Sequence, residues 1–266
     1  MISRVAIVVV AHDVDDYFSD LMAGLSRFCP AARVAWFDSG SASGPRHADV
    51  ERLAASRPLT YARITPSFFE IFEWFIDTSA SIVINVETDA AFVAPGHLLA
   101  VEQLLADADY MASRYRTGTA KTSRWRPYRS LRPDLPALLD LLGVELTDQA
   151  FSPGQVFSRR YVEALLSAEW YPELREFVAD NQIRERSFSL QEVLLPTLAR
   201  ALGLRARAYP PTWERYNRYR PYLAASAIRE AVAQGVSLIH PVRRDADDSA
   251  RRLVRSLACS NLLETE

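Results

Sequence analysis

Two carboxylates end a short apolar run in the first third of the chain. Residues 81–92 read Ser-Ile-Val-Ile-Asn-Val-Glu-Thr-Asp-Ala-Ala-Phe, so that Glu87 and Asp89 stand one residue apart. Uninterrupted apolar residues are typical of a strand buried on both faces. Open α/β sheets bind ligands beyond the carboxyl ends of their strands, where two such carboxylates can bind one divalent ion. The run predicts either a site for a metal-bound phosphate or a solvated turn capped by Asp89.

A further candidate acid, Glu192, closes the motif Ser189-Leu-Gln-Glu192 in front of an apolar run. A carboxylate placed opposite a departing phosphate can accept the proton of an attacking hydroxyl and so act as a general base. The same spacing is that of a capping box, with Ser189 as the helix cap and Glu192 as the third helical residue. Glu192 is therefore predicted to be a base, a capping residue, or both.

Two of the four histidines follow predicted strands. His12 comes after the first strand, and His240 stands between an apolar pair and Pro241. Strand ends that are distant in the sequence meet at one edge of a sheet, so His240 could join Asp89 and Glu87 around an ion. A site of imidazole and carboxylate ligands suits Mn²⁺ better than an all-oxygen site does. The alternative for either histidine is a structural role.

The aromatic residues fall into two groups. One group covers nearly the whole circumference of a helix, which predicts burial against the sheet and not a stacking platform: Phe68, Phe69, Phe72, Trp74 and Phe75. The other group lies among polar residues and could stack on a ligand ring or cover the sheet edge: Trp125, Tyr128, Trp213, Tyr216 and Tyr219.

A sheet must bring these residues together, and the first half of the chain alternates strand and helix patterns as a mostly parallel sheet requires. We expect strands at 5–10, 34–37, 59–64, 81–86 and 110–113. We expect helices at 17–28, 50–55, 66–76 and 95–105. The sequence thus predicts an α/β fold with helices flanking a mixed, mostly parallel sheet.

The second half of the chain is richer in helical patterns. We expect helices at 135–142, 160–166, 190–202, 222–233 and 245–263, and short strands at 155–157, 205–209 and 238–239. Residues 209–213 contain two prolines and are predicted to be an extended connector. Residues 114–132 read as a long basic and aromatic loop, either a lid over an anionic ligand or a solvated excursion. We divide the single domain into halves at 1–113 and 133–266, joined by this loop.

Composition excludes several classes of protein. With 266 residues, 49% hydrophobic residues and a net charge of -2, the chain suits one folded domain without bulk attraction to nucleic acid. Cys29 and Cys259 form neither a disulfide framework nor a metal cluster, which favours the cytoplasm. No run is long enough for a transmembrane segment, and the apolar start is predicted to be a first strand, not a signal peptide. One chain leaves the oligomeric state open.

Several local patterns, in this order, resemble the nucleotide-sugar glycosyltransferases of the GT-A fold. They are the first strand with His12 and Asp13, the strand end Trp36-Phe37-Asp38-Ser39-Gly40-Ser41, the segment Asn85-Val86-Glu87-Thr88-Asp89, the turn and strand at 151–158, the helix start at 189–199, and Ile239-His240-Pro241-Val242-Arg243. The third pattern stands in the place of the family's Asp-x-Asp metal motif, here with Glu at the first acid.

The resemblance implies a GT-A, Rossmann-like domain that binds a nucleoside-diphosphate sugar and transfers the sugar to a small-molecule or glycan hydroxyl. It implies Mn²⁺ or Mg²⁺ at Asp89 and His240, and inverting transfer with Glu192 as base. The nucleotide sugar would meet His12, Asp13, Asp38 and Glu87, and Arg243, Arg244 or Lys121 would neutralise the diphosphate.

Two other functions stay open. A nucleotidyltransferase shares a phosphate crevice and acidic metal ligands, but it is expected to carry a Gly-rich loop after its first strand. Residues 11–16 read Ala-His-Asp-Val-Asp-Asp and contain no glycine. The second alternative is a degenerate member that binds sugar nucleotide without turnover, which the Glu at position 87 leaves open.

Overall fold

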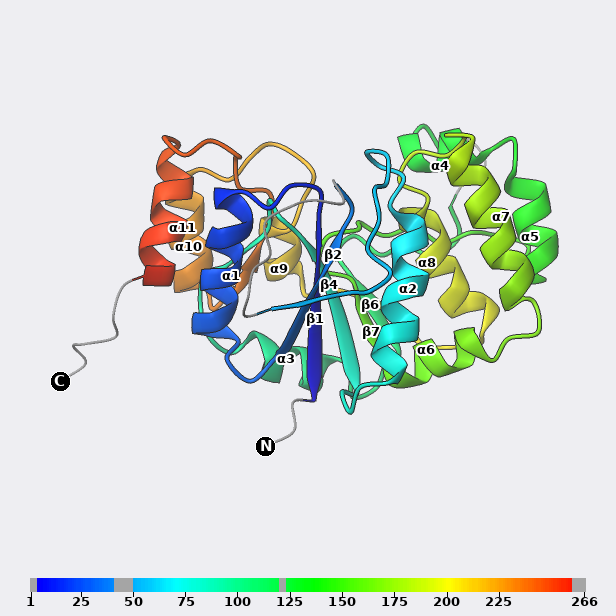
Figure 1. Ribbon diagram of the computed structural model, residues 1–266, viewed down its shortest axis with the longest axis horizontal. Helices are drawn as coiled ribbons and strands as arrows, with labels where there is room; N and C mark the ends of the chain where they lie inside the picture. Colours follow the sequence, from blue (N-terminus) through cyan, green and yellow to red (C-terminus); the bar gives the residue numbers. More distant parts are fainter. Residues whose placement is uncertain (1–3, 41–49, 120–122, 260–266) are drawn as a thin grey trace.

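The computed structural model describes residues 4–40, 50–119 and 123–259, and a mixed sheet runs through the middle of this part (Figure 1). Its seven strands lie in the order β3-β2-β1-β4-β7-β6-β8. The strands are β1 (Val5–Ala11), β2 (Arg33–Asp38), β3 (Glu51–Arg52), β4 (Ile82–Glu87), β6 (Tyr110–Ala112), β7 (Val156–Ser158) and β8 (Ala206–Ala208). Only β7 runs antiparallel to its neighbours, β4 and β6. The predicted α/β fold with a mostly parallel sheet is confirmed.

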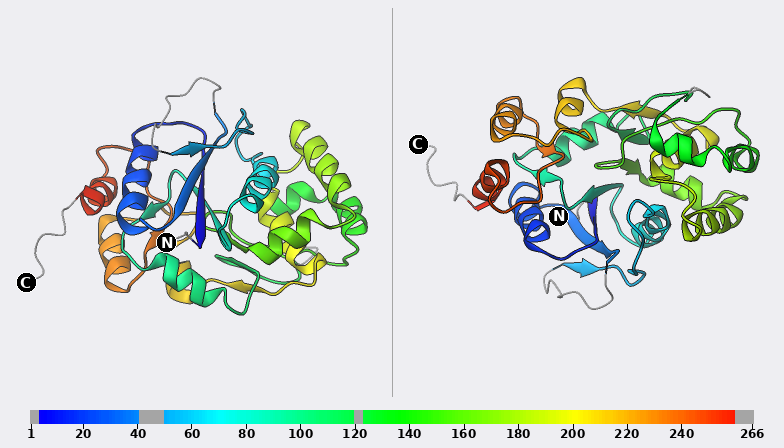
Figure 2. Two further views of the ribbon diagram at one scale, coloured as in Figure 1. Left: turned by 60° about the horizontal axis from the view of Figure 1, so that its bottom comes forward. Right: turned by 90° about the horizontal axis from the view of Figure 1, so that it is seen from above.

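Helices cover both faces of the sheet (Figures 1 and 2), and each face has its own hydrophobic core. One core packs against α1 (Asp16–Phe28), α3 (His97–Leu104), α9 (Pro211–Tyr216), α10 (Ala225–Ala233) and α11 (Ser249–Cys259). The other packs against α2 (Thr65–Ile76), α4 (Arg126–Leu131), α5 (Leu135–Leu142), α6 (Arg159–Leu166), α7 (Tyr171–Ile183) and α8 (Gln191–Ala201). None of the helices in the described ranges is both long and apolar enough to cross a membrane.

The two cores explain why β1 and β4 are almost wholly apolar. In β4, Ile84 and Val86 face the α1 side, whereas Val83 faces the α2 side. Side chains alternate along a strand, so Glu87 has the same parity as Val83 and belongs to the α2 side. The polar residue that ends the strand is therefore directed toward α2 and α8.

Parallel pairing brings the strand ends to one edge. Ala11 pairs with Asp38, and Val10 pairs with Glu87. A small second sheet pairs β5 (Ala91–Phe92), which follows β4 directly in the chain, with β9 (Leu238–Ile239). As expected for this arrangement, segments far apart in the sequence meet where the polar residues are.

Two elements predicted in the first half are wrong. Residues 50–55 were expected to be a helix, but Glu51–Arg52 forms the edge strand β3. Glu51 accepts hydrogen bonds from Arg33 at 2.9 Å and from the Trp74 indole at 2.8 Å, contacts that only the folded chain supplies. Residues 59–64 were expected to be a strand, but they form a turn in which Ala62 has φ 57°.

Two predicted connections contain short helices. The loop expected at 114–132 contains helix α4, and the extended connector expected at 209–213 contains the start of α9. Each helix has proline in its first turn, where the missing N–H breaks no helical hydrogen bond. Helix α7, which was not predicted, also begins in this way.

Gly40 is required because two strand ends approach closely. A Cβ at this position would lie 1.6 Å from the carbonyl oxygen of His12. We expect Gly40→Ala to push the His12 backbone aside and to lower the free energy of unfolding by about 1–3 kcal/mol, as overpacking does. Urea unfolding measures this change, and a variant as stable as the parent would contradict the close approach.

Candidate active site

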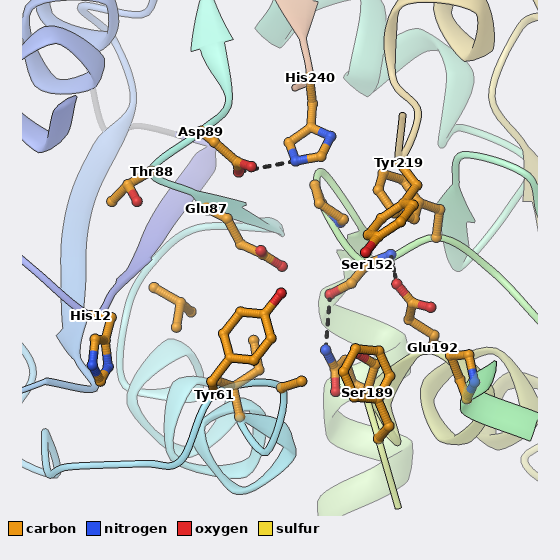
Figure 3. A pocket seen from close by; sticks show the side chains of 18 of the residues that line it. His12, Tyr61, Glu87, Thr88, Asp89, Ser152, Ser189, Glu192, Tyr219 and His240 are labelled. Atoms are coloured by element: carbon orange, nitrogen blue, oxygen red, sulfur yellow. Dashed lines mark hydrogen bonds and ion pairs between the residues drawn. The ribbon is translucent and has the colours of Figure 1, made fainter. Parts of the chain in front are cut away.

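A cavity of about 570 Å³ opens at the carboxyl ends of β1, β2 and β4. Its walls come from many parts of the chain: the residues after β1, the turn at 59–64, the end of β4 at 87–89, the segment 125–127, the loop 151–153, the start of α8, and the loops that carry Tyr219 and His240. In Figure 3, the side chains of Glu87, Tyr61 and Ser152, from three of these segments, surround one space. The sheet edge predicted from the sequence is therefore hollow.

Asp89 and His240 meet at this cavity although 151 positions separate them. The His240 Nε2 atom lies 2.9 Å from Asp89 Oδ1, as Figure 3 shows. The backbone fixes this pair, because β5 pairs with β9 through Ala91 and Ile239, and the Val242 N–H donates to the Asp89 carbonyl at 2.8 Å. The two residues predicted as metal ligands are thus held together by the small second sheet.

Both ring nitrogens of His240 face acceptors. Nδ1 lies 2.8 Å from the carbonyl oxygen of Arg218, and Nε2 faces the Asp89 carboxylate. Burial opposes protonation of His240, but the charge of Asp89 outweighs burial and raises the pKa of the imidazole. Burial likewise favours a neutral Asp89, but His240 outweighs it and lowers the pKa of that carboxyl. Each partner therefore favours the charged form of the other.

Glu87 lies between this pair and Ser152 in Figure 3. Burial raises the pKa of Glu87 to about 7, and the nearby charge of Asp89 adds to the rise. Asp89 therefore ionises more readily than Glu87, so the two acids can play different chemical roles.

Glu192 faces the same space from the opposite wall, in the first turn of α8 (Figure 3). Its Oε1 atom accepts a hydrogen bond from the Ser152 N–H at 3.3 Å. Burial raises the pKa of Glu192 to about 8, the hydrogen bond from Ser152 lowers it, and Glu87 raises it further. A buried carboxyl with a raised pKa is suited to proton transfer.

The capping-box interpretation of Ser189 and Glu192 is wrong. The helix cap is Leu190, without a side-chain cap hydrogen bond, and Ser189 has φ 48°. The Gln191 N–H instead donates to the Thr65 hydroxyl of α2 at 3.1 Å. A side chain from another helix thus satisfies the start of α8 and leaves the Glu192 carboxyl directed into the cavity.

The residues predicted to bind the nucleotide lie at different depths. His12 lines the cavity, and its Nδ1 atom lies 3.2 Å from the Ser39 carbonyl oxygen. Asp13 is exposed and stands 3.5 Å from Arg244. Asp38 is buried, with one oxygen accepting from Arg52 and the other from the Gly40 N–H. Both oxygens of Asp38 therefore already have protein partners.

Three basic residues were predicted to neutralise the diphosphate, and of the two that the structure describes, Arg244 lines the cavity and Arg243 does not. Lys121 lies outside the described residues. Arg243 packs over Tyr222, 5.3 Å from the ring centroid, whereas its neighbour Arg244 lines the cavity. Arg244 pairs with Asp15 at 2.5 Å. The charge of Arg244, like that of His240, lowers the pKa of Asp89.

Aromatic side chains form the rim, and the sequence indicated only some of them. Trp125 and Tyr219 line the cavity, whereas Tyr128, Trp213 and Tyr216 are buried in the cores. Tyr61 was not singled out, yet it is 78% exposed and points its hydroxyl toward Glu87 in Figure 3. An aromatic residue in a turn carries no local signal of this role, because the turn itself was predicted to be a strand.

The sequence matches no protein-family model, and comparison with curated proteins finds no significant match. Among solved structures, the galactosyltransferase LgtC, described in complex with donor and acceptor sugar analogues, aligns over 98% of both chains with a TM-score of 0.51. The protein has the GT-A fold. The sequence identity to LgtC is 12%, so the likeness concerns the fold alone.

Two further structures align less well. The apo form of the glycosyltransferase GlyE of Streptococcus pneumoniae has 11% identity and a TM-score of 0.47 over 96% of this chain and 60% of GlyE. The 2-C-methyl-D-erythritol 4-phosphate cytidylyltransferase of Thermus thermophilus has 15% identity and a TM-score of 0.40 over 85% of this chain and 97% of that enzyme. Neither score is high enough to favour one activity over the other.

Proposed function

We propose that this GT-A protein is a glycosyltransferase that moves a sugar from a nucleoside-diphosphate sugar to an acceptor hydroxyl, with metal assistance and inversion. The observation that carries this proposal is the pairing of Asp89 with His240 on one wall of a cavity that has the buried carboxyl of Glu192 on the other. A departing diphosphate needs positive charge near the first wall. An attacking hydroxyl needs a proton acceptor near the second.

The donor atoms fit a divalent cation. With a proton on Nδ1 shared with the Arg218 carbonyl, Nε2 of His240 is the nitrogen left for an ion, next to a carboxylate oxygen of Asp89. The described residues contain no cluster of three or more such ligands, so substrate oxygens or water would complete the coordination. Nitrogen with oxygen ligands suits Mn²⁺, with Mg²⁺ as the alternative. A bound cation would stabilise the charge that develops on the diphosphate.

The chain's own groups supply the remaining steps. Arg244 adds a second positive charge at the Asp89 wall, and His12 borders the nucleotide side of the cavity. Glu192, once ionised, would accept the proton of the acceptor hydroxyl as that oxygen attacks the sugar carbon. Its hydrogen bond from the Ser152 N–H would hold the carboxylate in place.

A thermal-shift assay tests the proposal at its first step. We expect UDP-, GDP- or dTDP-sugar to raise the melting temperature, and we expect Mn²⁺ to enlarge the shift, because both ligands bind only the folded state. Absence of a shift with every nucleotide sugar, with and without Mn²⁺, would contradict donor binding. Transfer without Mn²⁺ or Mg²⁺, in the presence of a chelator, would contradict the metal assignment alone.

A further inference from the structure

Two arginines at the cavity rim stack on aromatic rings. The Arg126 guanidinium lies 3.7 Å from the centroid of the Phe188 ring, and that of Arg220 lies 3.9 Å from the centroid of Tyr222. All four side chains line the cavity. Stacking covers one face of a guanidinium but leaves its N–H edges free to donate in the bidentate manner that carboxylates and phosphates accept. The rings thus hold both guanidinium groups in place with their N–H edges available to bind an anion.

Neither arginine has an acidic partner within the described ranges. Arg220 donates only to the Tyr219 carbonyl, at 3.4 Å, and Arg126 makes no hydrogen bond or ion pair with other described residues. Arg244, in the same cavity, is matched with Asp15 and Asp13. The charges of Arg126 and Arg220 at the rim are therefore uncompensated, whereas the charge of Arg244, near Asp89 and His240, is balanced. Two unpaired positive charges at a cavity rim attract anions to it.

The two arginines border one opening. Arg126 begins α4, on the wall that also carries α8, and Arg220 lies in the loop between α9 and α10. Tyr61 lies near both arginines. Its ring meets Phe188 edge-on with centroids 6.4 Å apart. Burial and the nearby acids raise the pKa of its hydroxyl, and the charge of Arg220 opposes that rise. In Figure 3, Tyr61 and Tyr219 approach this opening from different walls.

We propose that the acceptor is an anionic molecule whose phosphate or carboxylate group binds the N–H edges of Arg126 and Arg220 while its hydroxyl faces Glu192. The inference rests on the proposed function and names the class of its acceptor. A neutral acceptor would gain nothing from two unpaired guanidinium groups at the rim. An anionic one would exchange water for charge-assisted hydrogen bonds, which are about twice as strong as neutral ones.

Isothermal titration calorimetry with three matched sugars tests the inference. The probes are glucose, glucose 6-phosphate and glucuronate, which share a ring and differ in charge, so the last two separate phosphate from carboxylate. The proteins are the parent, Arg126→Ala, Arg220→Ala and the control Arg129→Ala, an exposed arginine on the same helix α4. Melting temperatures without ligand and with the donor sugars are recorded for each protein.

We expect at least one charged sugar to bind about ten-fold tighter than glucose, with an affinity that falls as salt is added. Arg126→Ala and Arg220→Ala should each remove most of that preference and leave the donor-induced thermal shift unchanged, and Arg129→Ala should alter neither. Equal affinity for the three sugars, no binding of either charged sugar, or an equal loss in Arg129→Ala would overturn the inference. Loss of the donor shift in the arginine variants would overturn it as well, because the arginines would then serve the donor. A parent protein without any donor shift would instead contradict the proposed function.

Discussion

The Glu192→Gln variant is expected to lose sugar transfer by about 10²–10⁴-fold in kcat while donor binding is retained, because an amide cannot accept the proton of the acceptor hydroxyl. The substitution keeps the shape of the side chain and an oxygen that can accept from the Ser152 N–H, so the fold should not change. Steady-state kinetics measure the loss, and the donor-induced thermal shift measures retention. Glu173→Gln, at an exposed position in the first turn of α7, is the control.

The pH profile gives this prediction a second test. With a pKa raised to about 8, Glu192 is mostly protonated at pH 7, so the fraction able to act as a base grows as the pH rises. We expect kcat/KM of the parent to increase with pH and to level off above about pH 8, and we expect the slope to vanish in Glu192→Gln. Besides burial, the groups that act on this titration are Glu87, which raises the pKa of Glu192, and the Ser152 N–H, which lowers it. A fully active Gln variant would remove Glu192 as base and, with it, the inverting assignment.

Asp89→Asn should abolish the effect of Mn²⁺ on donor binding. The amide lacks the negative charge that raises the pKa of His240 and that would bind a divalent cation in the proposed complex. Asparagine has the size of aspartate, so the β5–β9 pairing, which uses backbone atoms, should be kept.

The measurement is the difference between the thermal shifts with and without Mn²⁺, in the presence of the nucleotide sugar. We expect this difference to disappear and transfer to fall by at least 10²-fold, a loss of about 2.7 kcal/mol of transition-state stabilisation. Asp107→Asn, outside the cavity lining and paired with Arg207, is the control and should behave as the parent does. Unaltered metal dependence in Asp89→Asn would mean that the acidic strand end is structural.

The sheet could be predicted because its central strands carry the signal within themselves. Val5–Ala11 and Ile82–Glu87 are apolar on both faces, and each meets two hydrophobic cores. Helix α7 escaped prediction for the opposite reason. Two of its buried residues, Asn181 and Gln182, are polar and satisfy each other and Ser187 through hydrogen bonds, so the helix lacks a clean apolar stripe.

The site was predictable where a motif ends an element and unpredictable where a loop supplies the residue. The Asp89 and His240 pair follows from two strand ends that share one edge. Ser152, whose N–H donates to Glu192, and Tyr61, whose hydroxyl points toward Glu87, come from turns whose paths depend on long-range contacts. The predicted capping role of Glu192 was wrong because the cap comes from elsewhere: the Gln191 N–H donates to Thr65, 126 positions away.

The strand pair β5–β9 also links ligand binding to local unfolding of the C-terminal part of the chain. A cation held by both Asp89 and His240 would close a loop that spans the 151 positions between them. The segment from Leu238 to α11 could then detach only after the ion had left, so substrate-loaded protein should resist proteolytic clipping of its last helix far longer than the empty form.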